Sequence, residues 1–273
     1  MKNCIVKFVE NADFRSRMSS TPNTPSSGSK IYFISDFHLG APDHQNSLIR
    51  EKKICAWLDI IKADATALFI MGDVFDFWFE YKHAVPKGYV RLLGKLAELS
   101  DAGLPITLFT GNHDMWMFDY LQQEIGIQLF REPKEYEFNG KKFLIGHGDG
   151  LGPGDHGYKF IKKVFANKAC QWLFARLHPD FGIGMANYWS RRSRKHTGHH
   201  DEKYLGDDKE YLVQYIKEIE TTKHYDFYIF GHRHLPIDMK IGNSNYINLG
   251  DWLKYFTYAE WNGQYLFLKK FES

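Results

Sequence analysis

The chain has 273 residues, of which 44% are apolar and 25% are charged, and its formal net charge at pH 7 is +2. This composition is typical of a globular protein, and it excludes a mainly disordered, fibrous or membrane-embedded chain. Cys4, Cys55 and Cys170 are widely spaced, which excludes a disulfide framework and a CxxC-type zinc site. No segment approaches the apolar length of a membrane-spanning helix, so we expect a soluble protein of the cytoplasm.

The N-terminal segment differs in composition from the rest of the chain. Residues 19–29 have the sequence SSTPNTPSSGS, which is polar and rich in serine and proline. Such a segment buries too little apolar surface to offset the entropy lost on ordering. We therefore predict a flexible leader over residues 1–29 and a folded domain over residues 30–273.

From residue 30 onward, short apolar runs alternate with patterns of helical period. The pattern predicts strands at 31–34, 67–71 and 106–109, with helices at 48–61, 90–100 and 118–124. Further strands are predicted at 136–138, 143–145, 227–230, 246–248, 256–261 and 265–269. Asn-Gly turns at 139–140 and 262–263 join two pairs of these strands as hairpins. We expect an α/β fold with a second, partly antiparallel sheet.

A helical insertion is predicted at about residues 150–225, where strand patterns are absent. Its first part is basic: residues 151–200 contain nine Lys or Arg against two Asp, a net charge of +7, so the other 223 residues sum to −5. A basic segment on an acidic body indicates an anionic partner, such as phosphate, a lipid surface or nucleic acid. The alternative is a solvated basic face without a function.

Polar clusters follow five of the predicted strands directly. They are Asp36-Phe37-His38, Gly72-Asp73, Gly111-Asn112-His113-Asp114, Gly146-His147-Gly148-Asp149 and Gly231-His232-Arg233-His234. Taken singly, a histidine at a strand end is usually a surface or core residue, and a Gly-Asp pair is usually a turn. Ligands of open α/β sheets bind at the carboxyl ends of the strands, so we expect the five clusters to converge on one site.

The residue types in these clusters predict a pair of metal ions. Carboxylates, imidazoles and one amide oxygen suit Mn²⁺, Fe, Co²⁺ or Zn²⁺, whereas the absence of thiolates argues against structural zinc and the imidazoles argue against Mg²⁺ or Ca²⁺. Seven ligands are too many for one ion, so we predict two ions that share a carboxylate. The predicted ligands are Asp36, His38, Asp73, Asn112, His147, His232 and His234. Within Asp36-x-His38 and His232-x-His234, an extended chain would direct both side chains to one side.

The ordered set D-x-H, GD, GNHD, GHGD and GHRH resembles the motifs of the calcineurin-like metallophosphoesterase superfamily over residues 31 to about 251. The resemblance implies a four-layer α-β-β-α sandwich of two mixed sheets with a helical lid. It also implies Mn²⁺ as the expected metal. One ion would be held by Asp36, His38 and His234, the other by Asn112, His147 and His232, with Asp73 bridging both. The resemblance also implies that His113 approaches the phosphoryl group of the substrate. We expect Asp114 either to orient His113 or to cap a helix.

Within this superfamily the chain is similar to the UDP-2,3-diacylglucosamine hydrolases of lipid A synthesis, which carry a basic, helical lid between their HGD and GHxH motifs. This similarity implies hydrolysis of a pyrophosphate bond by a hydroxide shared between the two metals, giving UMP and an acylated sugar phosphate. By spacing, Asp155 and Tyr158 match residues of the head-group pocket. The stretch Ser190–Lys195 resembles the substrate-clamping stretch, so we also expect substrate contacts from Arg191, Arg194 and Lys195. The best-known branch has Arg at the position of His113, which indicates either a GNHD branch or a relative with an altered substrate.

The predicted lid is rich in apolar side chains at helical spacing. They are Phe160, Val164, Phe165, Trp172, Leu173, Phe174, Leu177, Phe181, Met185 and Trp189. We expect about half of them to pack onto the body of the domain and the rest to form a groove for acyl chains. A basic and apolar surface also favours an anionic bilayer, so we expect a peripheral location on the cytoplasmic face of the inner membrane.

Three other functions fit parts of the sequence. A nuclease of the same superfamily would use the basic lid on phosphates, but the lid aromatics have aliphatic neighbours rather than forming stacking platforms. A phosphomonoesterase or phosphodiesterase acting on another phosphorylated substrate would leave the apolar lid unexplained. A non-catalytic scaffold is expected to lose metal ligands, whereas all seven predicted ligands are present.

Overall fold

The computed structural model describes residues 29–154, 156–197 and 203–272, except for the side chains of residues 191–197. The predicted leader therefore lies outside the described residues apart from Ser29. In the described part of the chain, strands form a six-stranded sheet of order β11-β10-β1-β2-β3-β4 and a five-stranded sheet of order β5-β6-β7-β9-β8. No helix in this part is both long enough and apolar enough to cross a membrane.

The first sheet is parallel from β1 to β4 and is extended by an antiparallel pair, β10 and β11. Its strands are β1 (Lys30–Ile34), β2 (Ala65–Ile70), β3 (Ile106–Phe109), β4 (Gln128–Phe130), β10 (Thr257–Trp261) and β11 (Leu266–Lys270). The central strands are mostly apolar, as expected where both faces of a parallel sheet are covered. Accordingly, every residue of β3 is buried.

The second sheet is mixed. It consists of β5 (Lys134–Phe138), β6 (Lys141–Gly146), β7 (Phe227–Phe230), β8 (Pro236–Ile241) and β9 (Ser244–Leu249). β6, β7 and β9 run parallel, whereas β5 and β8 pair antiparallel to their neighbours at the two edges. The Asn139-Gly140 turn joins β5 to β6, and both of its residues have positive φ, as a tight hairpin requires.

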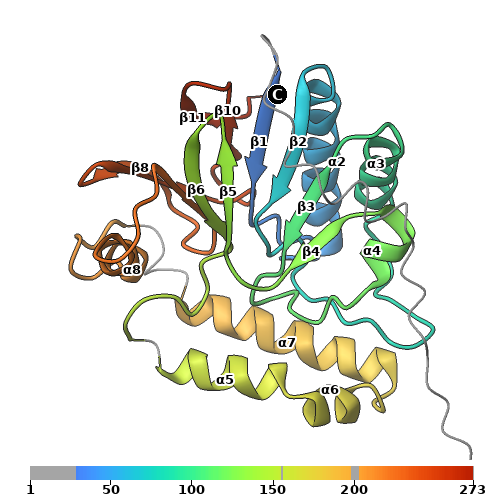
Figure 1. Ribbon diagram of the computed structural model, residues 1–273. Coiled ribbons are helices and arrows are strands. Elements are labelled where there is room, and N and C mark those ends of the chain that lie inside the picture. The colour runs from blue at the N-terminus through green and yellow to red at the C-terminus, as the bar shows by residue number, and fades with distance from the viewer. Residues whose placement is uncertain (1–28, 155, 198–202, 273) are drawn as a thin grey trace, which may run out of the picture.

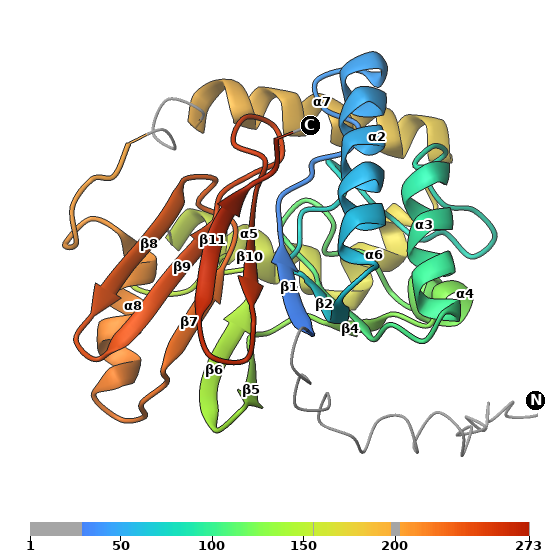
Figure 2. The same ribbon diagram turned by 90° about the horizontal axis from the view of Figure 1, so that it is seen from above.

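The two sheets pack face to face between helices, which confirms the expected four-layer sandwich (Figure 2). Helices α2 (His44–Ile61), α3 (Val90–Asp101) and α4 (Tyr120–Ile125) cover the first sheet, and α8 (Tyr211–Glu220) covers the second. Three apolar clusters separate the layers. One lies between the first sheet and its helices, one between the sheets, and one beneath α8.

Helix α2 fixes the loop that follows β1. It begins after Asp43, whose carboxylate accepts a hydrogen bond from the amide of Asn46. The buried guanidinium of Arg50 donates to the carbonyl oxygens of Phe37, His38 and Ala41 at 2.5 to 2.6 Å. The helix therefore holds the backbone of the D-x-H motif in place.

Helices α5 (His156–Ala166), α6 (Lys168–Phe174) and α7 (Pro179–Thr197) lie together beyond the ends of the strands, and we call these three helices the lid (Figure 1). The expected insertion reached to about residue 225 and included α8. In the structure α8 instead packs on the second sheet through Leu212, Val213 and Ile216. Its apolar face is covered by the sheet, so α8 belongs to the sandwich.

Candidate metal centre

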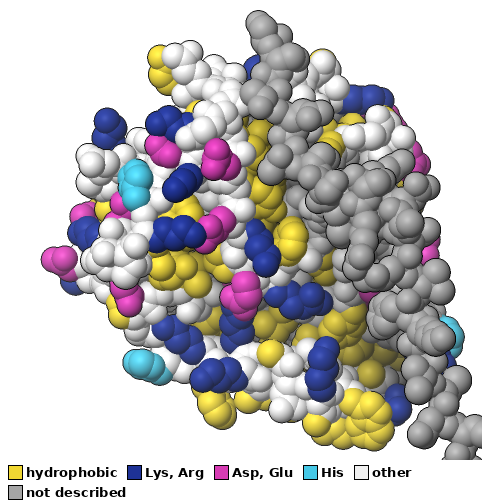
Figure 3. All heavy atoms as spheres, viewed as in Figure 1, with side chains coloured by type: hydrophobic (Ala, Val, Ile, Leu, Met, Phe, Trp, Pro, Cys, Tyr) yellow, Lys and Arg dark blue, Asp and Glu magenta, His cyan; other side chains and the backbone are white. Residues whose placement is uncertain are grey.

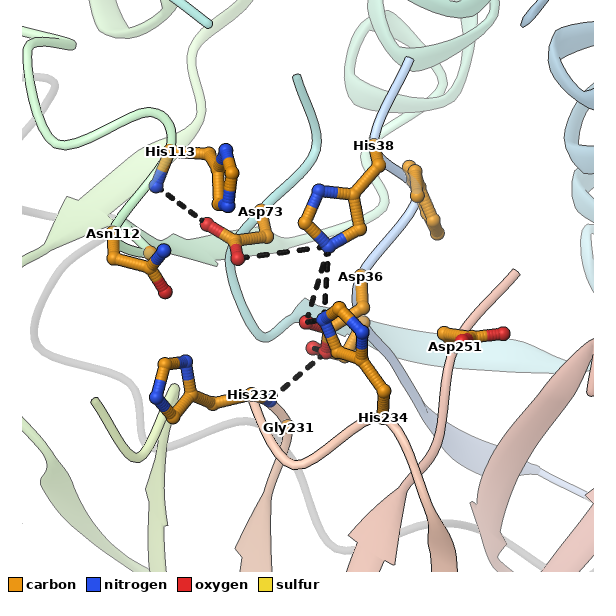
Figure 4. Close-up of polar contacts among 12 residues, drawn as sticks. Asp36, His38, Asp73, Asn112, His113, Gly231, His232, His234 and Asp251 are labelled. Carbon is orange, nitrogen blue, oxygen red and sulfur yellow. Dashed lines mark hydrogen bonds and ion pairs between the residues drawn. The ribbon is translucent and has the colours of Figure 1, made fainter. Parts of the chain in front are cut away.

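The five motif loops meet at the ends of β1, β2, β3, β6 and β7 (Figure 4). On one side of the site, Nε2 of His38 lies 3.7 Å from Asp36 Oδ1 and 3.7 Å from Asp73 Oδ2. Nε2 of His234 lies 3.1 Å from the same Asp36 Oδ1. Ligand atoms of Asp36, His38, Asp73 and His234 all lie within 4.8 Å of one another, so this group can hold a metal ion.

A second group of ligand atoms adjoins the first and shares Asp73 with it. Asp73, His147 and His232 also place their ligand atoms within 4.8 Å of one another. Nε2 of His147 lies 3.5 Å from Asp73 Oδ2 and 3.4 Å from Asn112 Oδ1. The structure thus brings together all seven side chains that the sequence predicted as ligands, with Asp73 between the two groups (Figure 4).

The buried oxygens of this site fit metal cations. Asp36 and Asp73 are almost completely buried, and Asp36 Oδ1 and Asp73 Oδ2 accept no hydrogen bond. A buried carboxylate oxygen that accepts no hydrogen bond is costly, and a divalent cation would offset that cost. The two groups of His and Asp donors fit a pair of metal ions, and such donors suit Mn²⁺, Fe²⁺, Co²⁺ and Zn²⁺.

The carboxylates control the protonation of the neighbouring imidazoles. Burial alone would lower the pKa of His38, but Asp36 and Asp76 raise it to about 10. Burial likewise opposes the charged form of His147, and Asp73 raises the pKa of that ring to about 10. Burial and the nearby His147 lower the pKa of His232 to about 4.

The backbone of the predicted ligands is strained. Asp36, His38, Asp73, His232 and His234 have φ values of 45° to 64°, in the left-handed region that residues other than glycine rarely adopt. The expectation that Asp36-x-His38 and His232-x-His234 are extended is therefore wrong. Strain of this kind persists only where the surrounding structure imposes it, and it concentrates at functional sites.

Glycines of the motifs let the loops approach one another closely. A Cβ atom added to Gly111 would lie 2.1 Å from Asp73 Oδ1, and one added to Gly231 would lie 2.5 Å from Asp36 Oδ2. At Gly72 the added atom would lie 2.7 Å from His147 Nδ1. Any other residue at these three positions would displace a predicted ligand.

His113 lies beside the first group and is contacted by the lid. Its ring centroid is 4.9 Å from that of His38. Its Nδ1 is 3.0 Å from the carbonyl oxygen of Asp76 and 3.3 Å from the hydroxyl of Ser190 on α7. That hydroxyl also donates to Asp76 Oδ2 at 3.0 Å. His38, Asp76 and His113 form a third group with atoms within 4.8 Å of one another. Asp76 was not among the predicted site residues.

Asp114 does not take either of the roles expected for it. Its carboxylate accepts hydrogen bonds from the amides of Gly111, Val74 and Phe75. The position of the His113 ring instead depends on Asp76 and Ser190, and α4 begins only after Asp119. Asp114 therefore ties the loop after β3 to the loop after β2, because three amide donors need an acceptor in this buried place.

The lid contacts the second group through α5. The hydroxyl of Tyr158 donates to Asp149, which also pairs with Lys162 at 2.8 Å. The ring centroid of Tyr158 is 6.1 Å from that of His232, so this predicted head-group residue adjoins the site. Asp155 lies outside the described residues, as do the side chains of Arg191, Arg194 and Lys195 on α7.

Part of the apolar surface of the lid packs on the body. Phe165 and Phe174 lie 5.2 and 4.7 Å from Trp116 between ring centroids, and Phe174 also adjoins Phe77 and Phe79. Other large side chains of the lid are more than half exposed. They are Phe160, Trp172, Leu173, Phe181, Tyr188 and Trp189.

The fold and the motif geometry agree with a match to a known family. Residues 29–236 match the model of the calcineurin-like phosphoesterases. This chain belongs to the calcineurin-like phosphoesterase family. A UDP-2,3-diacylglucosamine hydrolase of Porphyromonas gingivalis is 41% identical over 258 residues, which cover 89% of this chain and 98% of the relative. A protein of the same name from Shewanella oneidensis is 30% identical over 82% of this chain and 90% of its own length.

Solved structures also align with the chain along most of its length. An archaeal phosphodiesterase is 14% identical, with a TM-score of 0.43, over 88% of this chain and 98% of the solved chain.

Proposed function

We propose that this enzyme hydrolyses the pyrophosphate bond of UDP-2,3-diacylglucosamine and releases UMP and 2,3-diacylglucosamine 1-phosphate. The observation that carries the proposal is the convergence of seven buried or half-buried ligands into two groups that share Asp73. The choice of substrate is supported by the relative named UDP-2,3-diacylglucosamine hydrolase, which this chain matches over 98% of that relative's length.

In this proposal Asp36, His38 and His234 hold one cation, Asn112, His147 and His232 hold the other, and Asp73 contacts both. Two bound divalent cations lower the pKa of water to near 7 and neutralise charge on the phosphoryl oxygens. Mn²⁺ is the cation that we propose.

His113 is proposed to donate a hydrogen bond to a phosphoryl oxygen. Its Nδ1 faces the carbonyl oxygen of Asp76, which selects the tautomer with a proton on Nδ1 and orients the ring. Burial lowers the pKa of His113, which favours the neutral ring. Donation from Nε2 toward substrate then requires the protonated ring, which negative charge on the phosphoryl group would favour.

The lid is proposed to receive the acyl chains and to contact the membrane. Its exposed aromatic and aliphatic side chains lie among Lys159, Lys163 and Arg176, and Figure 3 shows basic and hydrophobic side chains mixed along its face. Such a surface binds acyl chains and anionic headgroups together. We therefore propose a peripheral position on the cytoplasmic face of the inner membrane, with Tyr158 near the sugar head group.

Product analysis tests the proposal directly. The full chain is incubated with Mn²⁺ and UDP-2,3-diacylglucosamine, and the products are separated by mass. We expect UMP and the acylated sugar phosphate, with little cleavage of a UDP-sugar that lacks acyl chains. Absence of UMP would contradict the proposal and favour a phosphatase or phosphodiesterase acting on another substrate.

A further inference from the structure

A hollow of about 250 Å³ lies between the lid and the body of the domain. Apart from Asp149, its lining residues come from the loop after β3, the segment between β4 and β5, and helices α5 and α6. Figure 1 places these four elements beside one another on the face toward the viewer. Neither the predicted head-group residues nor the exposed apolar side chains of the lid account for this hollow.

The hollow borders the proposed metal centre. Gly111, which lines it, directly precedes the predicted ligand Asn112. A narrower pocket lined by His147 and Gly148 shares Thr110, Asp149 and other lining residues with the hollow. A substrate phosphate at the second group of ligands could therefore extend one of its substituents into the hollow.

The lining combines aromatic rings with positive charge. Trp116, Phe118 and Phe165 contribute ring surface, and Lys168 holds its ammonium 5.7 Å from the centre of the Phe118 ring. Lys168 forms no ion pair with the described residues, whereas Lys162 is paired with Asp149. A nucleobase can stack on aromatic rings while a neighbouring cation attracts the phosphate of the nucleotide.

Hydrogen-bonding groups complete the lining. The amide of Gln171 donates to the carbonyl oxygen of Phe165 at 3.0 Å, and its own oxygen can accept from a base N–H. The exposed carboxylate of Glu132 can accept from ribose hydroxyls. The lining is mainly apolar, as the flat faces of a base require, and these polar groups distinguish it from the exposed lid side chains of Phe160, Trp172 and Phe181, which we propose for the acyl chains.

We propose that this hollow binds the uridine portion of the substrate, an inference that rests on the proposed function. The uracil ring lies against Phe118 and Phe165, Lys168 neutralises the phosphate of the UMP product, and Gln171 recognises the base. The substrate thus lies across the metal centre with its nucleotide end in the hollow and its acylated end against the lid.

The test measures UMP binding to the Mn²⁺-containing full chain by titration calorimetry, and the KM and kcat for UDP-2,3-diacylglucosamine. Lys168→Ala and Gln171→Ala are each compared with Lys52→Ala, which removes an exposed charge of α2 outside both the lid and the hollow. We expect at least a tenfold weaker UMP affinity and a tenfold higher KM for the first two variants, with wild-type values for the control. Thermal unfolding verifies that each variant is folded.

The two proposals fail in different ways. If Lys168→Ala and Gln171→Ala bind UMP as tightly as Lys52→Ala and keep its KM, the hollow is not the uridine site, even though the enzyme hydrolyses the substrate. If the wild-type chain does not cleave UDP-2,3-diacylglucosamine, the proposed function fails. A selective loss of UMP affinity in the two variants would then still support a nucleotide site.

Discussion

Ser190 of α7 donates a hydrogen bond to Asp76 at 3.0 Å, although 114 positions separate the two residues. The same hydroxyl lies 3.3 Å from Nδ1 of His113. The lid is therefore connected to the predicted catalytic histidine and not only laid over the site. Asp76 also contacts His38, because the Asp76 carboxylate lies 3.7 Å from Nδ1 of His38.

Removal of the Ser190 hydroxyl should lower turnover. Ser190→Ala removes one of the contacts that hold the His113 ring, and the loss of one such hydrogen bond is worth roughly 0.5 to 1.5 kcal/mol, or about twofold to thirteenfold in kcat. Steady-state kinetics measure the effect. Tyr188→Phe, an exposed change two residues away, should keep the wild-type kcat. Equal kcat values for both variants would contradict a role for Ser190 in positioning His113.

A methyl group at Gly111 should abolish metal binding. The added Cβ of Gly111→Ala would lie 2.1 Å from Asp73 Oδ1, so the shared carboxylate must move. Metal analysis after dialysis measures the loss. Gly94→Ala in α3 is the matched control, because no atom lies within 4 Å of its added Cβ. In that helix the alanine should stabilise the fold by up to about 1 kcal/mol. Normal metal content in Gly111→Ala would contradict the close packing of these loops.

Much of the sandwich could be predicted from the sequence, because its central strands are continuous apolar runs bounded by glycine motifs. β4 was missed, since three residues are too few to show a period. β8 was missed because it begins with Pro236 and alternates polar Asp238 and Lys240 with apolar residues, as an exposed edge strand does. α8 was assigned to the insertion because an amphipathic sequence pattern predicts a helix with one buried face but does not identify the element that covers that face.

The candidate site could be predicted only where residues fall in short motifs. Asp73 and His147 were found because glycines precede them at strand ends. The partnership of Asp76 with Ser190 depends on how the lid docks, and no local pattern encodes a contact between residues so far apart. The left-handed backbone at Asp36 and His38 was also missed, because it is imposed by the surrounding loops.

Metal binding should release protons and strengthen with rising pH. Despite the opposing effect of burial, carboxylates hold the pKa values of His38 and His147 at about 10, so both rings are protonated at pH 7 before a cation binds. Each cation must displace a proton, and its apparent affinity should rise as the pH increases from 6 toward 10. Calorimetry in buffers of different ionisation enthalpy counts the protons. Binding without proton release would show that the carboxylates do not charge these rings.

The lid should bind anionic vesicles through its exposed apolar side chains. Trp172 and Phe181 are 56% and 63% exposed, and replacing both with alanine removes a large part of this surface. Sedimentation with vesicles containing phosphatidylglycerol should show at least tenfold weaker binding for the double variant. Ile49→Ala and Ile60→Ala change exposed apolar residues of α2 and serve as controls. Equal binding by all variants would exclude the lid as the membrane contact.

The metal content of Asp73→Ala tests the central claim most directly. Asp73 belongs to both groups of ligands, so its removal should weaken both sites, whereas His147→Ala should weaken mainly one. Mass spectrometry of Mn²⁺-equilibrated protein should find about two ions per wild-type chain, about one in His147→Ala and fewer than one in Asp73→Ala. Hydrolysis should fall by several orders of magnitude in Asp73→Ala. Two retained ions and near-normal turnover in that variant would contradict a shared carboxylate at the centre of the site.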